Sequence, residues 1–228
     1  MDFTADEYTR RDVGRLREVL AGPPVTWLFL GDSITQAVLH TRGRRGFVEH
    51  FTERVRGEMG RLGDAVINSG VSGSTAESAL PEFHWRLGRF APDVVFVMFG
   101  TNDAADGIDG VRSYRYSLDQ IVQRARDVGA TVVLQTPPPV QPGGTRDPEV
   151  VEHYAADVRQ LAAERGVLVV DHQARWAGAG CPDAWFDDPT HPGAIGHVEL
   201  ARTLFEALRI DDEASATYTL KVGEGATR

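Results

Sequence analysis

Five short apolar runs, separated by amphipathic stretches, restrict the fold of this chain more than any other feature. The runs lie at residues 25–30, 65–68, 94–99, 131–135 and 167–171. The third run is apolar without alternation, which is typical of a central parallel strand that is covered on both faces. Strands and helices in alternation imply parallel strands joined by right-handed crossovers. The sequence therefore predicts an α/β fold, a three-layer α/β/α domain around a five-stranded parallel sheet.

Four of the intervening stretches place apolar residues on one face of a helix, which indicates helices that pack on the sheet. The expected faces are Phe47, Phe51, Val55, Met59 and Leu62; Tyr114, Leu118, Ile121, Val122, Ala125 and Val128; Val151, Tyr154, Val158 and Leu161; and Ile195, Val198, Ala201, Leu204, Phe205 and Leu208.

The 228 residues suffice for one well-buried domain and are few for two. Residues 6–20 have the pattern of an extra helix, so residues 1–22 are expected to form an N-terminal helical extension. The α/β domain is expected at residues 23–210, and residues 211–228 form a polar C-terminal tail. In that tail Tyr218, Leu220 and Val222 alternate, which leaves a short edge strand, a subunit contact and a disordered segment as alternatives.

Charge and composition exclude several functions. A net charge of -9 argues against a nucleic-acid partner, because phosphate contacts need clustered Lys and Arg. The single cysteine, Cys181, has no partner for an internal disulfide. The N-terminus has neither the basic start nor the apolar core of a signal peptide, and no apolar run approaches the ~20 residues that span a bilayer. We therefore expect a cytoplasmic protein without a membrane span; the oligomeric state is not predicted.

Polar residues with neighbouring glycines follow several of the apolar runs. In an open α/β sheet, ligands bind outside the carboxyl ends of the strands, so these residues are expected to meet at one edge. The segments are 31–33 after the first run, 68–75 after the second, 100–103 after the third and 186–191 beyond the fifth. The long loop at residues 136–148, with three consecutive prolines, is of the kind that often borders a binding site.

These residue types together fit hydrolysis by a serine nucleophile. Ser33 needs a base within hydrogen-bond reach, and His191 is the expected base. Asp188 lies three residues before His191, where its carboxylate can orient the imidazole. The oxyanion formed by attack on a carbonyl needs fixed donors, which we expect to be the backbone N–H groups of Ser33 and Gly73 and the side-chain amide of Asn102.

Competing assignments exist for several of these residues. Asp187 competes with Asp188 as the orienting acid but is expected to be a solvated loop residue. Gly70 competes with Gly73 as the oxyanion donor but is expected to serve the backbone conformation.

Other charged residues are given structural roles. Asp32 and Asp103 are expected to brace their loops by hydrogen bonds to backbone N–H groups. The basic cluster Arg42, Arg44 and Arg45 is interpreted as a solvated loop, with contact to an anionic substrate as the alternative. His40, His50, His84, His153 and His172 are scattered without metal-ligand spacing, and His197 is interpreted as a surface or core histidine, with a second base as the alternative.

The chain resembles the GDSL, or SGNH, hydrolase family of esterases and acylhydrolases. Four short blocks carry this resemblance in the family's order: Gly31-Asp32-Ser33-Ile34-Thr35, Ser72-Gly73-Ser74-Thr75, Gly100-Thr101-Asn102-Asp103 and Asp188-Pro189-Thr190-His191. The resemblance implies a flavodoxin-like sheet, no metal and no cofactor, and it reinforces the roles assigned above. The Gly-x-Ser-x-Gly elbow of the other common α/β esterase fold is missing from the sequence.

Together these observations predict a serine ester hydrolase that works through an acyl-enzyme. The expected substrate is a short acyl ester, such as an O-acetyl ester, of a small molecule or a carbohydrate, because no long apolar segment suggests a deep fatty-acyl tunnel. An acyltransferase that uses the same acyl-enzyme, or a lysophospholipase or thioesterase, is the alternative. A non-catalytic binding module on the same fold is the third interpretation.

Overall fold

Five parallel strands, in the order β2-β1-β3-β4-β5, form the centre of the computed structural model, which describes residues 14–221. The strands are β1 (Thr26–Gly31), β2 (Ala65–Gly70), β3 (Val94–Met98), β4 (Thr131–Gln135) and β5 (Leu168–Val170). Every neighbouring pair is parallel. The predicted α/β class and the five strands are confirmed, with strand ends shifted by no more than two residues.

The strand order reverses at β1. The chain leaves β1 for β2 on one side and later returns to place β3 on the other side of β1. Loops that leave the sheet in opposite directions open a crevice at such a switch point, where ligands bind in open α/β sheets. The segment after β1, which begins with Asp32 and Ser33, therefore starts at the position most suited to a site.

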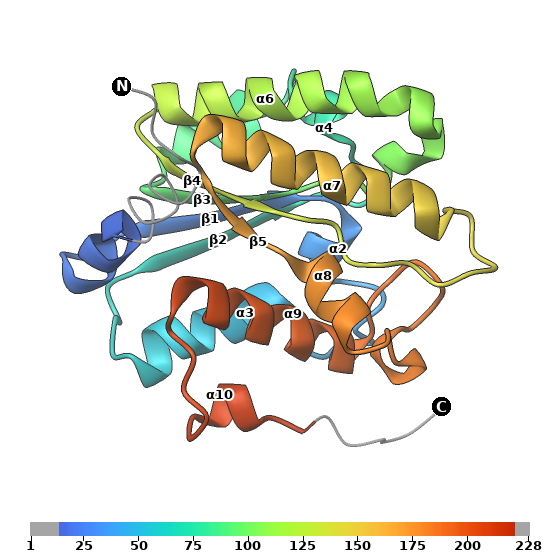
Figure 1. Ribbon diagram of the computed structural model, residues 1–228. Helices are drawn as coiled ribbons and strands as arrows, with labels where there is room; N and C mark the ends of the chain where they lie inside the picture. The colour runs from blue at the N-terminus through green and yellow to red at the C-terminus, as the bar shows by residue number, and fades with distance from the viewer. Residues whose placement is uncertain (1–13, 222–228) are drawn as a thin grey trace.

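Helices cover both faces of the sheet (Figure 1). On one face lie α6 (Val111–Asp127) and α7 (Pro148–Arg165); on the other lie α3 (Phe47–Thr52) and α9 (Ala194–Leu208). Side chains along β1 alternate between two separate cores: Leu28 and Leu30 pack in the first, whereas Trp27 and Phe29 pack in the second. A strand that is buried on both faces needs apolar residues at every position, which explains the runs without alternation.

Short helices connect these elements. They include α2 (Ser33–Gln36), α4 (Ala76–Ala79), α5 (Phe83–Arg86), α8 (His172–Gly178) and α10 (Ala216–Thr219), with a π-helix η1 (Glu53–Glu58) and 3-10 turns η2 (Gly88–Phe90), η3 (Asp103–Asp106), η4 (Ile108–Gly110) and η5 (Asp183–Trp185).

The predicted helical faces on α6, α7 and α9 are buried except at their ends, but the first face is wrong at Leu62, which is 72% exposed. The helix that begins at Phe47 widens into the π-helix η1, and Met59 caps its end. A π turn holds more residues than an α turn, so the 3.6-residue periodicity no longer fixes the face. Gly60, with φ +73°, then turns the chain away before Leu62.

Both ends of the described chain pack against the rest of the protein. Residues 14–21 are helical and bury Leu16 in a core, whereas the rest of the expected helix at 6–20 lies outside the described residues. The edge-strand alternative is wrong for Tyr218, which lies in the helix α10; Val222 lies outside the described residues. The carboxylate of Glu58 accepts hydrogen bonds from the backbone N–H (2.8 Å) and the hydroxyl (2.5 Å) of Thr217, which holds α10 against η1. None of the helices within residues 14–221 is long and apolar enough to cross a membrane.

A buried carboxylate fastens the start of β1. Asp64 accepts hydrogen bonds from the Trp27 indole N–H (2.7 Å), the Arg61 guanidinium (2.7 Å) and the Val25 N–H (3.2 Å). Arg61 also donates to the Leu20 carbonyl, which lies before β1 in the chain. The side chains of Arg61 and Asp64 are 12% and 1% exposed, so each charge depends on the other for compensation.

We predict that Asp64→Ala lowers the free energy of unfolding by about 3–5 kcal/mol, because it leaves the Arg61 charge and the Trp27 N–H without their acceptor. Urea unfolding followed by Trp fluorescence measures the change. Glu53→Ala is the control: it breaks the exposed pair with Arg45 and is expected to cost less than about 1 kcal/mol. Equal losses in the two variants would contradict the importance of burial.

Candidate active site

Ser33 is the first residue of α2, directly after the end of β1. Asp32 caps this helix, because its carboxylate accepts a hydrogen bond from the Ile34 N–H at 2.9 Å. Gly31 makes the tight turn: a Cβ there would lie 2.1 Å from the Thr35 hydroxyl and 2.7 Å from the Met98 carbonyl. Only glycine fits between the strand and the helix, and this turn places Ser33 at the edge of the sheet.

The structure brings Ser33, His191 and Asp188 into one chain of contacts. The Ser33 Oγ lies 3.1 Å from the His191 Nε2, although 158 positions separate the two residues. The His191 Nδ1 lies 3.0 and 2.9 Å from the two Asp188 oxygens. The Asp188 carboxylate also accepts the backbone N–H groups of Thr190 and His191, each at 2.8 Å, so its own loop fixes it.

Opposing effects set the pKa values of this pair. Burial raises the pKa of Asp188, but the hydrogen bonds from Thr190 and His191 outweigh it and leave the pKa below its usual value. Burial lowers the pKa of His191 below its usual value, the charge of Asp188 opposes this shift, and His40 adds to it. His191 is thus held neutral at a lower pH than a free histidine, with a proton acceptor directed at Ser33.

Asp187 does not fill the orienting role, and the interpretation as a solvated acid is also wrong. Its carboxylate pairs with the Arg42 guanidinium at 2.7 Å and with the His40 Nδ1 at 3.3 Å, and its side chain is only 18% exposed. Arg42 is therefore part of an ion pair at the site rather than a purely solvated loop residue. Arg45, from the same cluster, pairs with Glu53 instead.

The glycine and asparagine segments lie side by side at the strand ends. Gly73 has φ +78°, and within residues 14–221 no atom beyond its chain neighbours lies within 4 Å of where its Cβ would be, so its backbone is open to a ligand. The Asn102 amide donates to the Ser74 carbonyl at 3.1 Å, which joins the two segments. At Gly70 a Cβ would lie 2.4 Å from the Gln36 nitrogen. Gly70 therefore permits close packing of β2 on α2, and its backbone does not need the left-handed region.

Two buried acids, Asp32 and Asp103, accept hydrogen bonds from backbone N–H groups of these loops, as expected. Asp103 accepts the N–H groups of Ala76 (2.9 Å) and Gly100 (3.0 Å). Burial raises the pKa of Asp32 to about 7 and that of Asp103 to about 6. Both acids therefore titrate near neutral pH although their hydrogen bonds favour the charged form.

Arg86, which the sequence analysis missed, joins three of the site segments. Its buried guanidinium donates to the carbonyls of Gly31 (2.6 Å) and Ser69 (3.0 Å) and to the Ser74 hydroxyl (3.0 Å). These acceptors belong to the ends of β1 and β2 and to the glycine segment. Nothing in the local sequence distinguishes Arg86 from the exposed arginines, because its burial depends on the strand ends above it.

Arg146 connects the proline-rich loop to the asparagine segment. Its Nε donates to the Thr101 carbonyl at 2.9 Å, and its Nη2 lies 3.4 Å from the Asn102 Oδ1. With its oxygen facing Arg146, the Asn102 amide directs its N–H groups toward the glycine segment. In the same loop the Gln141 N–H donates to the Pro189 carbonyl at 2.7 Å. The expectation that this loop borders the site agrees with these contacts.

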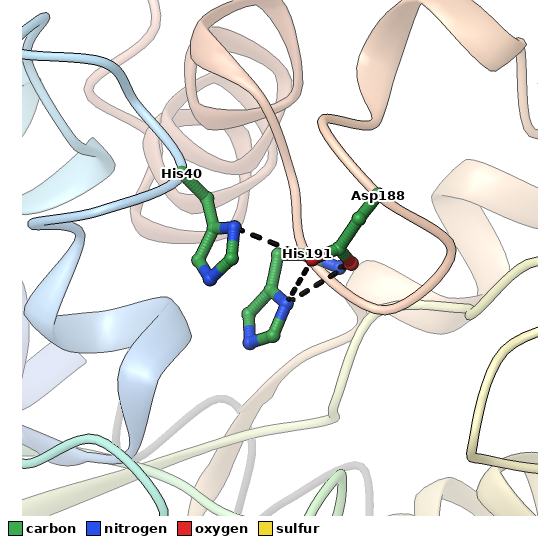
Figure 2. A group of neighbouring side chains, drawn as sticks. All are labelled: His40, Asp188 and His191. Carbon is green, nitrogen blue, oxygen red and sulfur yellow. Dashed lines mark hydrogen bonds and ion pairs between the residues drawn. The ribbon is translucent and has the colours of Figure 1, made fainter.

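His40, which the sequence analysis counted among scattered histidines, lies directly on His191 (Figure 2). The two imidazole rings are parallel within 4°, with centroids 3.6 Å apart. The His40 Nδ1 lies 3.3 Å from a carboxylate oxygen of Asp187 and 3.3 Å from one of Asp188. No spacing in the sequence signals this contact, because the fold brings together His40 and His191 from positions far apart in the chain.

Ligand atoms of His40, Asp188 and His191 lie within 4.8 Å of one another, which is close enough to consider a metal ion. A bound zinc ion needs nitrogen lone pairs that converge on one point about 2 Å away. The lone pairs of two parallel stacked rings run side by side instead, and both Nδ1 atoms are within hydrogen-bond reach of the carboxylate. The geometry fits a hydrogen-bonded cluster better than a metal site.

Comparisons with known proteins identify the family and the fold. A model of the GDSL-like lipase/acylhydrolase family matches residues 29–198. An acetylxylan esterase of Geobacillus stearothermophilus is 28% identical over 203 residues, which are 79% of this chain and 92% of that protein. The crystal structure of a catalytic mutant of Axe2, an acetylxylan esterase from the same organism, superimposes with a TM-score of 0.71 at 26% identity and covers 82% of this chain and 95% of that one.

A further solved structure supports the fold alone. LAE5, an α/β hydrolase from the metagenome of Lake Arreo, has a TM-score of 0.72 at 22% identity and covers 83% of this chain and 97% of its own. The family match covers most of the chain and includes all four sequence blocks. The chain therefore belongs to the GDSL-like lipase/acylhydrolase family and is a carboxylic ester hydrolase.

Proposed function

We propose that this enzyme removes short acyl groups, such as O-acetyl groups, from a carbohydrate or another small molecule through an acyl-enzyme on Ser33. The observation that carries the proposal is the continuous contact from the Ser33 hydroxyl through His191 to Asp188. Such an arrangement turns a weakly nucleophilic hydroxyl into one that can attack an ester carbonyl.

In the first half of the reaction the Ser33 Oγ attacks the carbonyl carbon while the His191 Nε2 takes its proton. The Asp188 carboxylate stabilises the imidazolium that forms and keeps the proton on Nδ1. The carbonyl oxygen becomes an oxyanion, for which we assign the N–H groups of Ser33 and Gly73 and the amide of Asn102 as donors. The open backbone at Gly73 and the oriented amide at Asn102 support this assignment.

In the second half the tetrahedral intermediate expels the alcohol. The C–O bond to the leaving oxygen breaks, and His191 passes its proton to that oxygen, so an ester of Ser33 and a free alcohol result. Water then repeats the sequence: His191 takes a proton from the water, the acyl group leaves as an acid, and Ser33 regains its proton. The two half-reactions balance with the ester and water alone.

The comparisons favour a short acyl group and a carbohydrate alcohol. Acetylxylan esterases are among the relatives that match most of this chain, and solved structures of catalytic mutants of Axe2 have a serine, an aspartate or a histidine replaced by alanine. The same three residue types meet here in Ser33, Asp188 and His191. A cytoplasmic location stays a prediction from the sequence, which fractionation of cells that produce the protein would test.

We predict that Ser33→Ala lowers kcat/KM for p-nitrophenyl acetate by at least about 10⁴-fold, because no other group near His191 replaces the lost nucleophile. Release of p-nitrophenolate measures the rate. In the wild type, pre-steady-state measurements at high enzyme concentration should show a burst of p-nitrophenolate if loss of the acyl group is slow.

Ser113→Ala, at an exposed position of α6, is the matched control and should keep the full rate. The same assay with a series of p-nitrophenyl esters tests the acyl group: the acetyl ester should be cleaved much faster than the decanoyl ester. Unchanged activity in Ser33→Ala would refute the nucleophile, and faster cleavage of the decanoyl ester would refute the short-acyl preference.

We predict that kcat/KM falls on the acid side with a midpoint below pH 6.5, because burial lowers the pKa of His191 and only its neutral form accepts the Ser33 proton. Asp188→Asn removes the charge that raises this pKa. The midpoint should move to still lower pH while the rate falls by about 10³–10⁴-fold, since the correct tautomer is lost. Stopped-flow pH profiles with p-nitrophenyl acetate measure both changes.

Asp32→Asn is the control for this assignment, because burial raises the pKa of Asp32 to about 7. An asparagine can still accept the Ile34 N–H, so α2 keeps its cap. The acid midpoint should stay in place in Asp32→Asn. A midpoint that disappears in this variant would assign the titration to Asp32 and not to His191.

We predict that Asn102→Ala lowers kcat for p-nitrophenyl acetate by about 10²–10³-fold with little change in KM, because an oxyanion donor acts in the transition state. Arg146→Met should lower kcat less, by about tenfold or less, since it removes only the contact that orients the Asn102 amide. The double variant should be no slower than Asn102→Ala. Additive losses would contradict an effect of Arg146 through Asn102.

A further inference from the structure

His40 is the residue of the site for which the proposed reaction has no role. It follows α2 at the edge of the sheet, and its ring covers one face of the His191 ring at 3.6 Å (Figure 2). Both Nδ1 atoms face the same Asp188 oxygen, His40 at 3.3 Å and His191 at 2.9 Å. Two imidazoles thus share one carboxylate.

The contacts fix both the orientation and the tautomer of His40. An ionised carboxylate only accepts hydrogen bonds, so the proton that His40 shares with Asp187 and Asp188 lies on its Nδ1. Asp187 accepts from the same nitrogen and is itself paired with Arg42 at 2.7 Å. The ring is therefore held by two carboxylates and by the stack on His191.

The Nε2 edge of His40 points to the same side as the His191 Nε2, which contacts Ser33. Because the rings are parallel and both Nδ1 edges face Asp188, both Nε2 edges point the same way, as Figure 2 shows. The His191 Nε2 lies 3.1 Å from the Ser33 Oγ and must also reach the leaving oxygen to protonate it. The His40 Nε2 lies one ring spacing away from that position.

The His40 Nε2 is also available for a ligand. Within residues 14–221 the polar contacts of His40 all involve Nδ1, and its side chain is 25% exposed. A second base is a poor explanation, because the Ser33 hydroxyl bonds to His191. A purely structural ring would need neither the two carboxylates on its Nδ1 nor an open Nε2.

We propose that His40 determines specificity on the alcohol side of the ester: its Nε2 binds a hydroxyl group on the carbon next to the ester-bearing carbon, as in the vicinal diols of carbohydrates. The two oxygens of such a diol lie about one hydrogen-bond length apart, which fits two nitrogens on stacked rings. A hydroxyl group both donates and accepts, so it can bond to the Nε2 in either protonation state. This inference rests on the proposed esterase function and names its alcohol.

The test compares two acetate esters of equal size, 2-hydroxyethyl acetate and propyl acetate, which differ in one hydroxyl group. The ratio of their kcat/KM values is measured for the wild type, His40→Phe, His40→Asn and His40→Gln. Phenylalanine keeps the ring and loses both nitrogens. An asparagine amide reaches the place of Nδ1, whereas a glutamine amide reaches the place of Nε2.

We expect the preference for the hydroxyl ester to fall by roughly threefold to tenfold in His40→Phe and His40→Asn, the range of one hydrogen bond. His40→Gln should keep most of the preference. General damage to the base would slow both esters alike and leave the ratio unchanged. A ratio that stays at the wild-type value in all three variants, or a wild type without any preference for the hydroxyl ester, would overturn the proposal.

p-Nitrophenyl acetate separates this failure from failure of the proposed function, since its alcohol carries no vicinal hydroxyl. Ser33-dependent cleavage of this ester with an unchanged ratio in the His40 variants refutes the role of His40 alone. Cleavage that is absent, or that persists in Ser33→Ala, refutes the esterase mechanism itself, and the role of His40 falls with it. Thermal unfolding of each variant confirms that the folded enzyme is compared.

Discussion

The carbonyl at the end of β1 holds the site together. The Gly31 carbonyl accepts the Val71 N–H at 3.0 Å and the buried Arg86 guanidinium at 2.6 Å. These two bonds tie the strand that presents Ser33 to the segment after β2, and Arg86 adds the Ser74 hydroxyl. The strand order also reverses at β1, so these bonds lie next to the switch point, where ligands bind in open α/β sheets. Oxyanion stabilisation depends on donors that are in place before the charge develops, and this bracing supplies that condition.

His191 and Asp188 belong to a loop rather than a strand end, so hydrogen bonds within that loop hold them in place. The loop closes on itself: the Asp188 carboxylate accepts two of its own N–H groups, and the Asp187 N–H donates to the His191 carbonyl at 2.9 Å. The proline-rich loop packs against it through Pro189. A carboxylate with so many donors stays ionised, while burial keeps His191 neutral at rest. The pair is therefore ready to accept a proton.

The fold was predictable because β1, β3 and β4 are buried along almost their whole length, so that each is a largely apolar run between turn residues. The residues of the four blocks were predictable because they combine a serine, an amide, an aspartate and a histidine, a set that fits ester hydrolysis and that turn formation alone does not explain. The exposure of Leu62 was not predictable, because the π-helix η1 changes the helical period on which the predicted face depends. Arg86, Arg146 and His40 were missed for a common reason: each acts through a partner that is distant in the sequence. Local patterns describe how a segment folds but not which loops it will meet.

In the proposed reaction, alcohol recognition and base positioning depend on the same carboxylates. Arg42 pairs with Asp187, and His40 reaches both Asp187 and Asp188, so one short segment contacts the acid to which we assign the orientation of the general base. The hydrogen bond that the His40 Nδ1–H donates to the Asp188 carboxylate withdraws some of the carboxylate's negative charge from His191. If an alcohol hydroxyl binds the far edge of His40, it acts on the same ring that shares Asp188 with the base. The sheet fixes the nucleophile independently of this segment, so substrate choice can change with this segment while the position of Ser33 stays the same.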